Sequence, residues 1–510
     1  MRILKTMPIA FCLMLLIYAQ NAHAYIVSGD VAAWNDDPYD IEVETPQLID
    51  VFGMYTSLRW ITIVKSSVFS WLNLGIDIPR NIHFHDYPYS DNDTDINADF
   101  CCDGNCTSGC PGKARYPYGS GSDDCEVILY SLGVCAASWS DDRSNSCDFQ
   151  GILTHEFGHC LGLDEHGSPP ETVMTADLEY QAYPMRFPRV DDVNGSRYTQ
   201  GMDSWPMYYR TRGYSTWSYM NELTAGMPSV TDVYYGGYSW HVYAWISTEA
   251  TPGYVVWKVE REGGGFGPVC HANLSGYQPT FDGVAVSAQA VGFAIAYREY
   301  NDNAYIRVIR GLVPSLTSCG GYNTWNQLLT PSPRRPSLAY DVNSNRLILA
   351  YIDKFNGNIK YRTAVSTNGF GAERTFPETQ PEFTDTPVAI SCGYWNSAGS
   401  YRCFLAFPKA DGQHRWRLCR GYIDAGGVLQ KDNCTDSTGT YYPANVAGSV
   451  IIENGNKVRI MYTGTDDNRT LNYIIYDCST GSCIWSNSLS NGSTPTGPAM
   501  SGSREVHAGY

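Results

Sequence analysis

The stretch RLILAYIDKFNGNIKYRTAV, residues 346–365, shows the pattern that governs the second half of the chain. An apolar run centred on Tyr351 is followed by a polar turn and then by NIKYRTA, in which polar and apolar residues alternate. Alternation with a period of two is typical of a β-strand that buries one face. The stretch therefore predicts two strands joined by a short turn.

This pattern is repeated along residues 201–510, where turns rich in Gly, Asn and Ser separate short strands and no helix is expected. The apolar strands of the six repeats are WHVYAW, FAIAYR, LILAYI, CFLAFP, RIMYTG and VHAGY, centred on the aromatic residues Trp245, Tyr297, Tyr351, Phe407, Tyr462 and Tyr510. Their spacings are 52, 54, 56, 55 and 48 residues. A period near 50 with about four strands per unit indicates a β-propeller. A β-sandwich with accidental periodicity is the alternative.

The last repeat is incomplete, because the sequence stops within its central strand. Residues 207–223 resemble the second half of a repeat that has no first half of its own. We therefore expect a six-bladed propeller over 201–510, closed by a blade that residues 207–223 share with 498–510. Such closure would leave no exposed sheet edge.

The N-terminus has the features of a secretory signal peptide over residues 1–24. Arg2 and Lys5 precede a short apolar run, and Ala22, His23 and Ala24 form a cleavage-site pattern. No later segment is apolar over the length that a transmembrane helix needs. The sequence thus predicts a secreted protein (extracellular, periplasmic or on the cell surface) without a transmembrane segment.

Cysteine usage fits an oxidising compartment. Beyond the predicted signal peptide, eight cysteines lie between Cys101 and Cys160 and eight between Cys270 and Cys483. Even numbers on both sides of a boundary near residue 200 favour two domains with separate disulfides. In the propeller we expect the pairs Cys392–Cys403, Cys419–Cys434 and Cys478–Cys483, each of which could join adjacent strands or span a tight turn. The net charge of -17 argues against nucleic acid as a partner.

Residues 25–200 mix helical and strand patterns and carry the clearest chemical motif. We expect a helix over 57–74, a strand over 81–87 and two short strands over 125–139, followed by a helix with His155, Glu156 and His159 in HEFGH. Two histidines four residues apart lie on the same side of a helix, which suits two ligands of a tetrahedral zinc ion. Glu156 beside them is placed to accept a proton from a zinc-bound water.

Two residues downstream extend this motif. Gly162 can adopt the left-handed conformation that ends a helix, and Met174 follows a proline-rich turn that could pass beneath the metal. The whole segment HEFGHCLGLDEHGSPPETVM resembles the active site of the metzincin metalloproteases, and most closely their matrixin branch. The resemblance covers residues 56–180, is specific over 150–175 and implies an α+β zinc endopeptidase fold, which we assign to a domain over residues 25–200. It also implies His155 and His159 as zinc ligands, Glu156 as the general base and Met174 as the methionine of the turn.

The third zinc ligand departs from the family pattern. Counting back from Met174 favours His166, whereas counting forward from Gly162 favours Glu165. Adjacent residues of an extended segment point to opposite sides, so one of the two is expected to face the zinc, and we favour His166 with Glu165 as the alternative.

Two weaker metal signals occur before the helix. His83 and His85 alternate on one strand, and an acidic segment suggests a possible Ca²⁺ site although the glycine and glutamate of an EF-hand loop are missing. Its acidic residues are Asp91, Asp93, Asp95 and Asp99.

Two functions follow from this reading. The first is a secreted zinc endopeptidase that hydrolyses peptide bonds through a zinc-activated water, with a propeller that binds its protein or peptide substrate, a glycan or a surface. The alternative is an adhesion or glycan-binding propeller protein with a vestigial protease domain.

Overall fold

The computed structural model describes most of residues 205–508 and a smaller set of earlier residues. Within 205–508 it leaves out 248–253, 273–278, 291, 300–304, 312–314, 321, 326–330, 354–355, 366–368, 378, 380–381, 383, 385, 410–414, 439–447, 465–469, 481 and 495. Before 205 it describes 41–44, 64, 67–68, 70–71, 82–85, 94–99, 112–115, 126–130, 139–140, 147–164, 173–174, 188 and 192. The predicted signal peptide lies outside the described residues.

The described residues before 205 form a small sheet with a helix against it. The five strands are β1 (Ile41–Glu44), β2 (Ile82–His85), β3 (Thr94–Asp99), β4 (Gly112–Arg115) and β5 (Glu126–Tyr130), in the order β2-β1-β3-β5-β4. All neighbours run parallel except β4, which is antiparallel to β5. Strands β6 (Trp139–Ser140) and β7 (Cys147–Asp148) pair separately. The expected strands at 81–87 and 125–139 are therefore confirmed where they are described.

Helix α4 (Phe149–Cys160) carries the HEFGH segment and contacts β4 and β5. It begins at Asp148, whose Oδ1 accepts a hydrogen bond from the Gly151 backbone N–H at 2.8 Å and so satisfies a donor of the first turn. It ends where Gly162 adopts φ = 84°, a conformation that glycine reaches without steric cost. The helix ends as its sequence predicts.

Part of the helix expected over 57–74 is also described. Val64, Ser67, Val68, Ser70 and Trp71 have helical backbone and buried side chains. The indole Nε1 of Trp71 donates to the Thr154 carbonyl at 3.0 Å, and Ser67 Oγ donates to the Gln150 carbonyl at 3.2 Å. These bonds fix the segment against α4.

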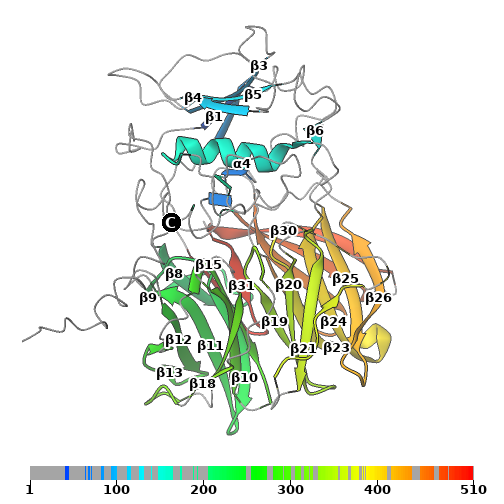
Figure 1. Cartoon of the computed structure of the whole chain (residues 1–510). Helices are drawn as coiled ribbons and strands as arrows, with labels where there is room; N and C mark the ends of the chain where they lie inside the picture. Colours follow the sequence, from blue (N-terminus) through cyan, green and yellow to red (C-terminus); the bar gives the residue numbers. More distant parts are fainter. Residues whose placement is uncertain are drawn as a thin grey trace, which may run out of the picture.

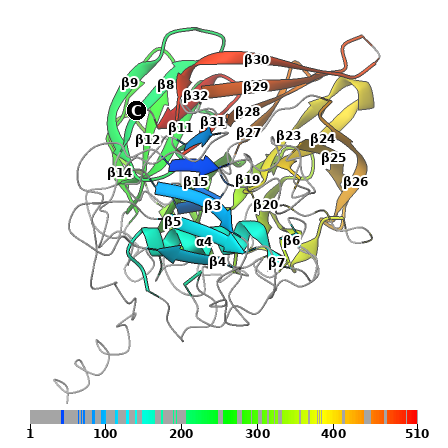
Figure 2. The same cartoon turned by 90° about the horizontal axis from the view of Figure 1, so that it is seen from above.

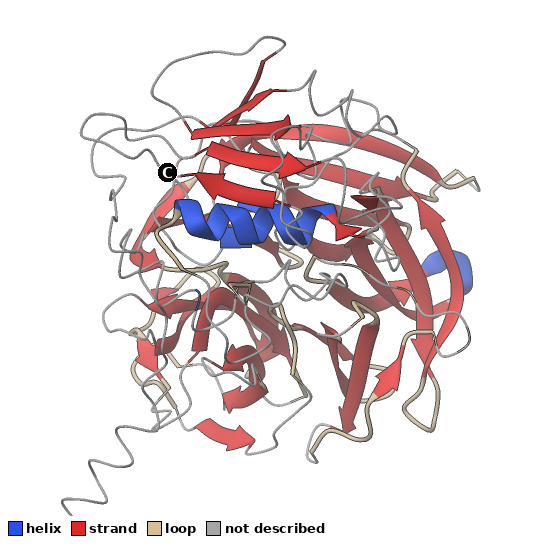
Figure 3. Cartoon of the chain, turned by 45° about the horizontal axis from the view of Figure 1, so that its top comes forward, coloured by secondary structure: helices blue, strands red, loops and turns tan. Residues whose placement is uncertain are grey.

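The rest of the described chain consists of β-strands and their connecting turns, apart from the 3-10 helix η2 (Asn396–Ala398), as Figure 3 shows. Five sheets follow one another along the chain. The first contains β10 (Ser229–Tyr235), β11 (Tyr238–Ser247), β12 (Tyr254–Arg261), β13 (Gly265–Phe266) and β14 (Cys270–His271), and the second contains β15 (Pro279–Ala288), β16 (Phe293–Glu299), β17 (Ile306–Gly311) and β18 (Tyr322–Trp325). The third contains β19 (Ser337–Asp341), β20 (Arg346–Ile352), β21 (Ile359–Val365) and β22 (Arg374–Thr375), the fourth β23 (Ala389–Trp395), β24 (Ser400–Pro408), β25 (Trp416–Ile423) and β26 (Leu429–Asp436), and the fifth β27 (Ser449–Glu453), β28 (Lys457–Thr463), β29 (Thr470–Asp477) and β30 (Ile484–Ser493). Each is antiparallel, and the buried aromatic of each repeat lies in its second strand. Figure 2 shows these sheets arranged around a centre.

The sixth sheet joins the two ends of the repeat region. Its order is β31 (Pro498–Met500), β32 (Arg504–Ala508), β8 (Trp205–Thr211) and β9 (Ser218–Thr224). Strand β32 pairs antiparallel with β8 from Arg504 opposite Thr211 to Ala508 opposite Met207. The ring is therefore closed by hydrogen bonds between residues nearly 300 positions apart.

Serine hydroxyls join neighbouring inner strands in alternation. Ser229 Oγ accepts the N–H of Val286, Ser337 Oγ accepts that of Ile390, and Ser449 Oγ accepts that of Met500, at 2.9–3.2 Å. Each bond satisfies a backbone donor of the next sheet, which the sheet's own ladder leaves unused. The inner strands are thus held together in three pairs.

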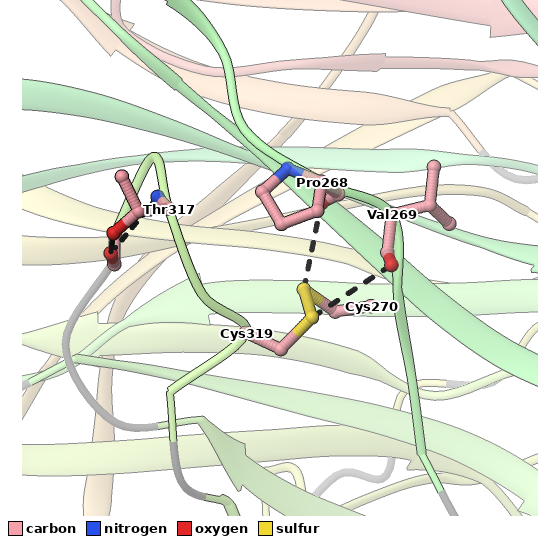
Figure 4. The surroundings of a disulfide bond; sticks show 6 residues. Pro268, Val269, Cys270, Thr317 and Cys319 are labelled. Carbon is pink, nitrogen blue, oxygen red and sulfur yellow. Dashed lines mark hydrogen bonds between the residues drawn. A yellow bond between two sulfur atoms is a disulfide. The ribbon is translucent and has the colours of Figure 1, made fainter.

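Four disulfides tie the propeller. The three predicted pairs, Cys392–Cys403, Cys419–Cys434 and Cys478–Cys483, are all confirmed. A fourth, Cys270–Cys319, joins β14 to the segment before β18 and so links two sheets (Figure 4). It could have been inferred, because these are the two cysteines that remain once the other six of this half are paired.

The predicted fold class is correct in part. The described structure is mostly β, and its antiparallel sheets form a propeller, as the repeats predicted. The metzincin-like α+β catalytic domain is not supported: α4 is the one α-helix with described bounds, and the described chain is nearly all β-sheet. No helix among the described residues is long and apolar enough to cross a membrane.

His507, in the closing strand β32, should make stability depend on pH. Burial lowers its pKa, a hydrogen bond to the Ala508 carbonyl raises it and the charge of Arg210 lowers it, and the net pKa is about 4. The unfolded chain binds a proton near pH 6.5 and the folded chain does not, so stability is complete above pH 6.5 and is lost as the pH falls towards 4. We expect the free energy of unfolding to fall by about 2 kcal/mol more between pH 7 and pH 5 than in His507→Phe. Urea denaturation at both pH values measures this, and parallel pH profiles for the two proteins would contradict it.

Candidate functional site

His155, Glu156 and His159 lie together on α4, as HEFGH predicts. One possible ligand atom from each lies within 4.8 Å of the others. His155 and Glu156 are buried, at 1% and 3% exposure, and the two imidazole rings are nearly perpendicular with centroids 4.8 Å apart. The helix therefore brings two imidazoles and a carboxylate to one small region.

Backbone carbonyls determine the tautomer of both histidines. His155 Nδ1 lies 2.6 Å from the Val173 carbonyl oxygen, and His159 Nδ1 lies 2.8 Å from that of Leu163. A carbonyl oxygen only accepts, so each Nδ1 carries the hydrogen and donates it. In a neutral imidazole the electron pair is then on Nε2, and such Nδ1–H bonds are typical of zinc-binding histidines. The donor set thus fits a divalent transition metal.

Met174 supports this region from the next segment. A Cβ added at Gly158 would lie 2.3 Å from Met174 Sδ and 2.9 Å from Trp71, so the methionine packs directly on α4. Asp192, which is 1% exposed, accepts the backbone N–H of Val173 at 3.0 Å and that of Met174 at 3.3 Å. The turn that carries the Val173 carbonyl is therefore held in place by a buried carboxylate.

The other predicted metal ligands are not tested. His166 and Glu165 lie outside the described residues, so the third ligand stays a prediction. His83 and His85 lie in β2, as expected. Asp95 and Asp99 lie in strand β3 rather than in a loop, and the rest of the acidic segment lies outside the described residues.

A cavity of about 250 Å³ lies between the inner strands of all six sheets. The residues that line it include Ser287, Ser391, Ser501 and Asp232. The Asp232 carboxylate already accepts hydrogen bonds from the hydroxyls of Ser501 and Ser503. It extends along β19 from Arg335, before the strand, to Val342, which is 61% exposed in the turn after it. The propeller thus encloses a polar cavity that reaches the hairpin end of the inner strands.

Tyrosines are the main exposed apolar side chains at that end. Tyr234 and Tyr238 flank the β10–β11 turn with exposures of 77% and 53%, and Tyr394, at the end of β23, is 48% exposed. The guanidinium of Arg261 lies 4.9 Å from the centre of the Tyr238 ring. The β10–β11 hairpin lies at the end of the propeller far from α4 (Figure 1). Tyr234 and Tyr394 each lie two residues beyond a residue that lines the cavity.

Comparison with known proteins places the chain in no family. No family model matches it, and no curated protein matches it. Among solved structures it is similar to AofleA from Arthrobotrys oligospora, with 11% identity, TM-score 0.38 and coverage of 59% of this chain and 81% of that one. It is also similar to the lectin of Aleuria aurantia, a six-bladed β-propeller, with 10% identity, TM-score 0.38 and coverage of 55% of this chain and 85% of the lectin. A Hadza microbial sialidase, Hz136, has 13% identity and TM-score 0.32, and the match spans 49% of this chain and only 55% of the sialidase.

These findings contradict the zinc-endopeptidase reading. No metzincin or other family model matches the chain, and no metalloprotease is among the similar structures named above. The matrixin assignment and the peptide-hydrolysing activity are therefore wrong, and a protein or peptide substrate is not supported. The catalytic role predicted for Glu156 is not tested. The physical reason is that the motif specifies a helix, α4, with two histidines on one side, and this arrangement occurs in proteins of many activities.

Proposed function

We propose that this protein is a secreted carbohydrate-binding propeller. The observation that carries the proposal is the set of exposed tyrosines at the hairpin end of the propeller, near inner strands whose serines line the cavity. A sugar ring presents C–H groups on its faces and hydroxyls at its edge. Tyrosine faces bury the former at a low cost in conformational entropy, and serine hydroxyls can bond the latter.

Size and polarity support this ligand class. A cavity of about 250 Å³ is smaller than the 300–1,000 Å³ that is typical of drug-sized ligands, so it suits a small polar molecule or the end of a chain. The tyrosines add a partly apolar surface at the same end. Four disulfides are consistent with the extracellular location where such binding would occur, and the predicted signal peptide would supply secretion.

Substitution of the two most exposed hairpin tyrosines tests the proposal. We expect labelled full-length protein to bind at least one glycan of an immobilised panel, and Tyr234→Ala/Tyr238→Ala to weaken that binding at least tenfold, since each stacked ring contributes about 0.5–1.5 kcal/mol beyond its buried area. Tyr214→Ala is the matched control, because Tyr214 is 68% exposed in the β8–β9 turn of the outer edge. Absence of binding to every glycan, or equal binding by the double variant, would refute the proposal.

We further propose that α4 holds a zinc ion through His155 and His159. The support is the pair of Nδ1–H bonds to the Val173 and Leu163 carbonyls, which orient each ring with its Nε2 electron pair available for coordination when the ring is neutral. In a secreted propeller protein such an ion would stabilise the helix and the Met174 turn. Metal analysis of purified full-length protein tests this directly.

A further inference from the structure

The end of the cavity opposite the tyrosines contains a buried arginine. Arg335 lies two residues before β19, lines the cavity and is only 5% exposed. Its Nη1 donates to the Val284 carbonyl, whereas its buried Nε has no hydrogen-bond partner. This Nε has almost no accessible surface, so a ligand in the cavity would contact the outer nitrogens of the guanidinium.

A carboxylate lies near Arg335, which keeps its charge at neutral pH. Burial lowers the pKa of Arg335 and Asp282 raises it, and the net value is about 10. Asp282 also forms an ion pair with the buried Arg298, with Nε and Oδ2 3.4 Å apart. Arg335 is therefore positively charged at pH 7, and that charge attracts an anion in the cavity.

A second donor lies two residues along the same wall. Ser337 Oγ accepts the Ile390 N–H at 3.2 Å, which leaves its hydroxyl hydrogen to be donated elsewhere. Ser337 is 8% exposed and also lines the cavity. A guanidinium and a hydroxyl on one polar wall are the groups that bind oxyanions in proteins.

We propose that this end of the cavity binds a small oxyanion, a carboxylate or a phosphate, with Arg335 as the charged donor. The neighbouring Arg334 donates from Nη2 to Ser70 Oγ at 3.2 Å, so this end faces the helical segment that packs on α4. The site is distinct from the tyrosine surface and does not require that surface to bind glycans.

Thermal unfolding of the full-length protein tests the site. Acetate and inorganic phosphate are titrated separately at constant ionic strength and pH 7. We expect at least one of them to raise Tm by several degrees in a saturable manner, because a ligand that binds only the folded state stabilises it. Response to acetate alone identifies a carboxylate site, and response to phosphate alone a phosphate site. Absence of a saturable response to both would overturn the proposal.

Two variants separate a ligand-binding arginine from a structural one. Arg335→Met should abolish the response and, without added anion, be at least as stable as the wild type, because it removes a buried charge. Arg335→Lys should keep the fold, checked by near-ultraviolet circular dichroism, and bind the anion at least tenfold more weakly. Arg346→Gln is the control and should respond as the wild type does, since Arg346 bonds the Ala425 carbonyl in an exposed position. An unchanged anion response in Arg335→Lys, or a large loss of stability in Arg335→Met without anion, would refute the proposal.

Discussion

Glu505→Ala should lower the free energy of unfolding by about 3–5 kcal/mol, the range found when one partner of a buried ion pair is removed. Glu505 is 1% exposed in β32 and accepts hydrogen bonds from Arg210 Nε at 2.6 Å and from Tyr473 OH at 2.8 Å. Arg210 lies directly opposite it on β8, and Tyr473 lies in β29 of the neighbouring sheet. The substitution therefore removes the carboxylate that connects the closing sheet to the next one.

Urea denaturation of the full-length protein measures this loss. Glu262→Ala is the control, since Glu262 is exposed in the turn after β12 and its substitution should change stability by less than about 0.5 kcal/mol. The double variant Arg210→Met/Glu505→Leu should recover part of the loss, because it leaves no buried charge behind. A Glu505→Ala protein within about 1 kcal/mol of the wild type would show that this ion pair does not hold the closing sheet.

The strand pattern of the propeller could be predicted because it depends on local residue order. Aromatics such as Tyr297 and Tyr351 are at most 1% exposed in second strands, where the apolar runs placed them. The same position of each repeat packs between neighbouring sheets, so it needs the same type of residue. The repeats are therefore visible as a periodic pattern in the sequence.

Helix α4, which carries His155 and His159, could be predicted equally well, but its function could not. The N-cap at Asp148 and the left-handed Gly162 are local properties of the chain. The matrixin resemblance added an activity that the comparisons contradict, because a short motif specifies which side chains meet and not what they do with a substrate.

The cavity residues escaped prediction because their environment is assembled from distant segments. Arg335 stands in SPRRPS, which in the sequence resembles an ordinary polar turn. Its burial depends on Val284 and Asp282, about fifty residues away on another sheet. The exposed tyrosines could not be predicted either. The chain contains 38 tyrosines, and the sequence does not indicate which of them are exposed in the folded protein.

Zinc content should depend on His155 and His159 alike. We expect about one zinc ion per chain in the wild type. Either His155→Ala or His159→Ala should lower the zinc content to less than about a tenth of that value, because a zinc site that has lost one of its protein ligands rarely retains the ion. His271→Ala is the matched control, since His271 is exposed in β14 and should leave the content unchanged. Elemental analysis after dialysis, with circular dichroism to verify folding, gives the comparison.

The same measurement identifies the third ligand. Zinc lost from His166→Ala and kept by Glu165→Ala would support His166, which the interval to Met174 favours, and the reverse would establish Glu165. Three histidines leave the ion with its full double charge, whereas a carboxylate lowers the net charge of the site by one and so weakens its pull on any further ligand. Full zinc content in both His155→Ala and His159→Ala would show that the metal, if bound, lies elsewhere, and that the Val173 and Leu163 carbonyls orient these rings for packing alone.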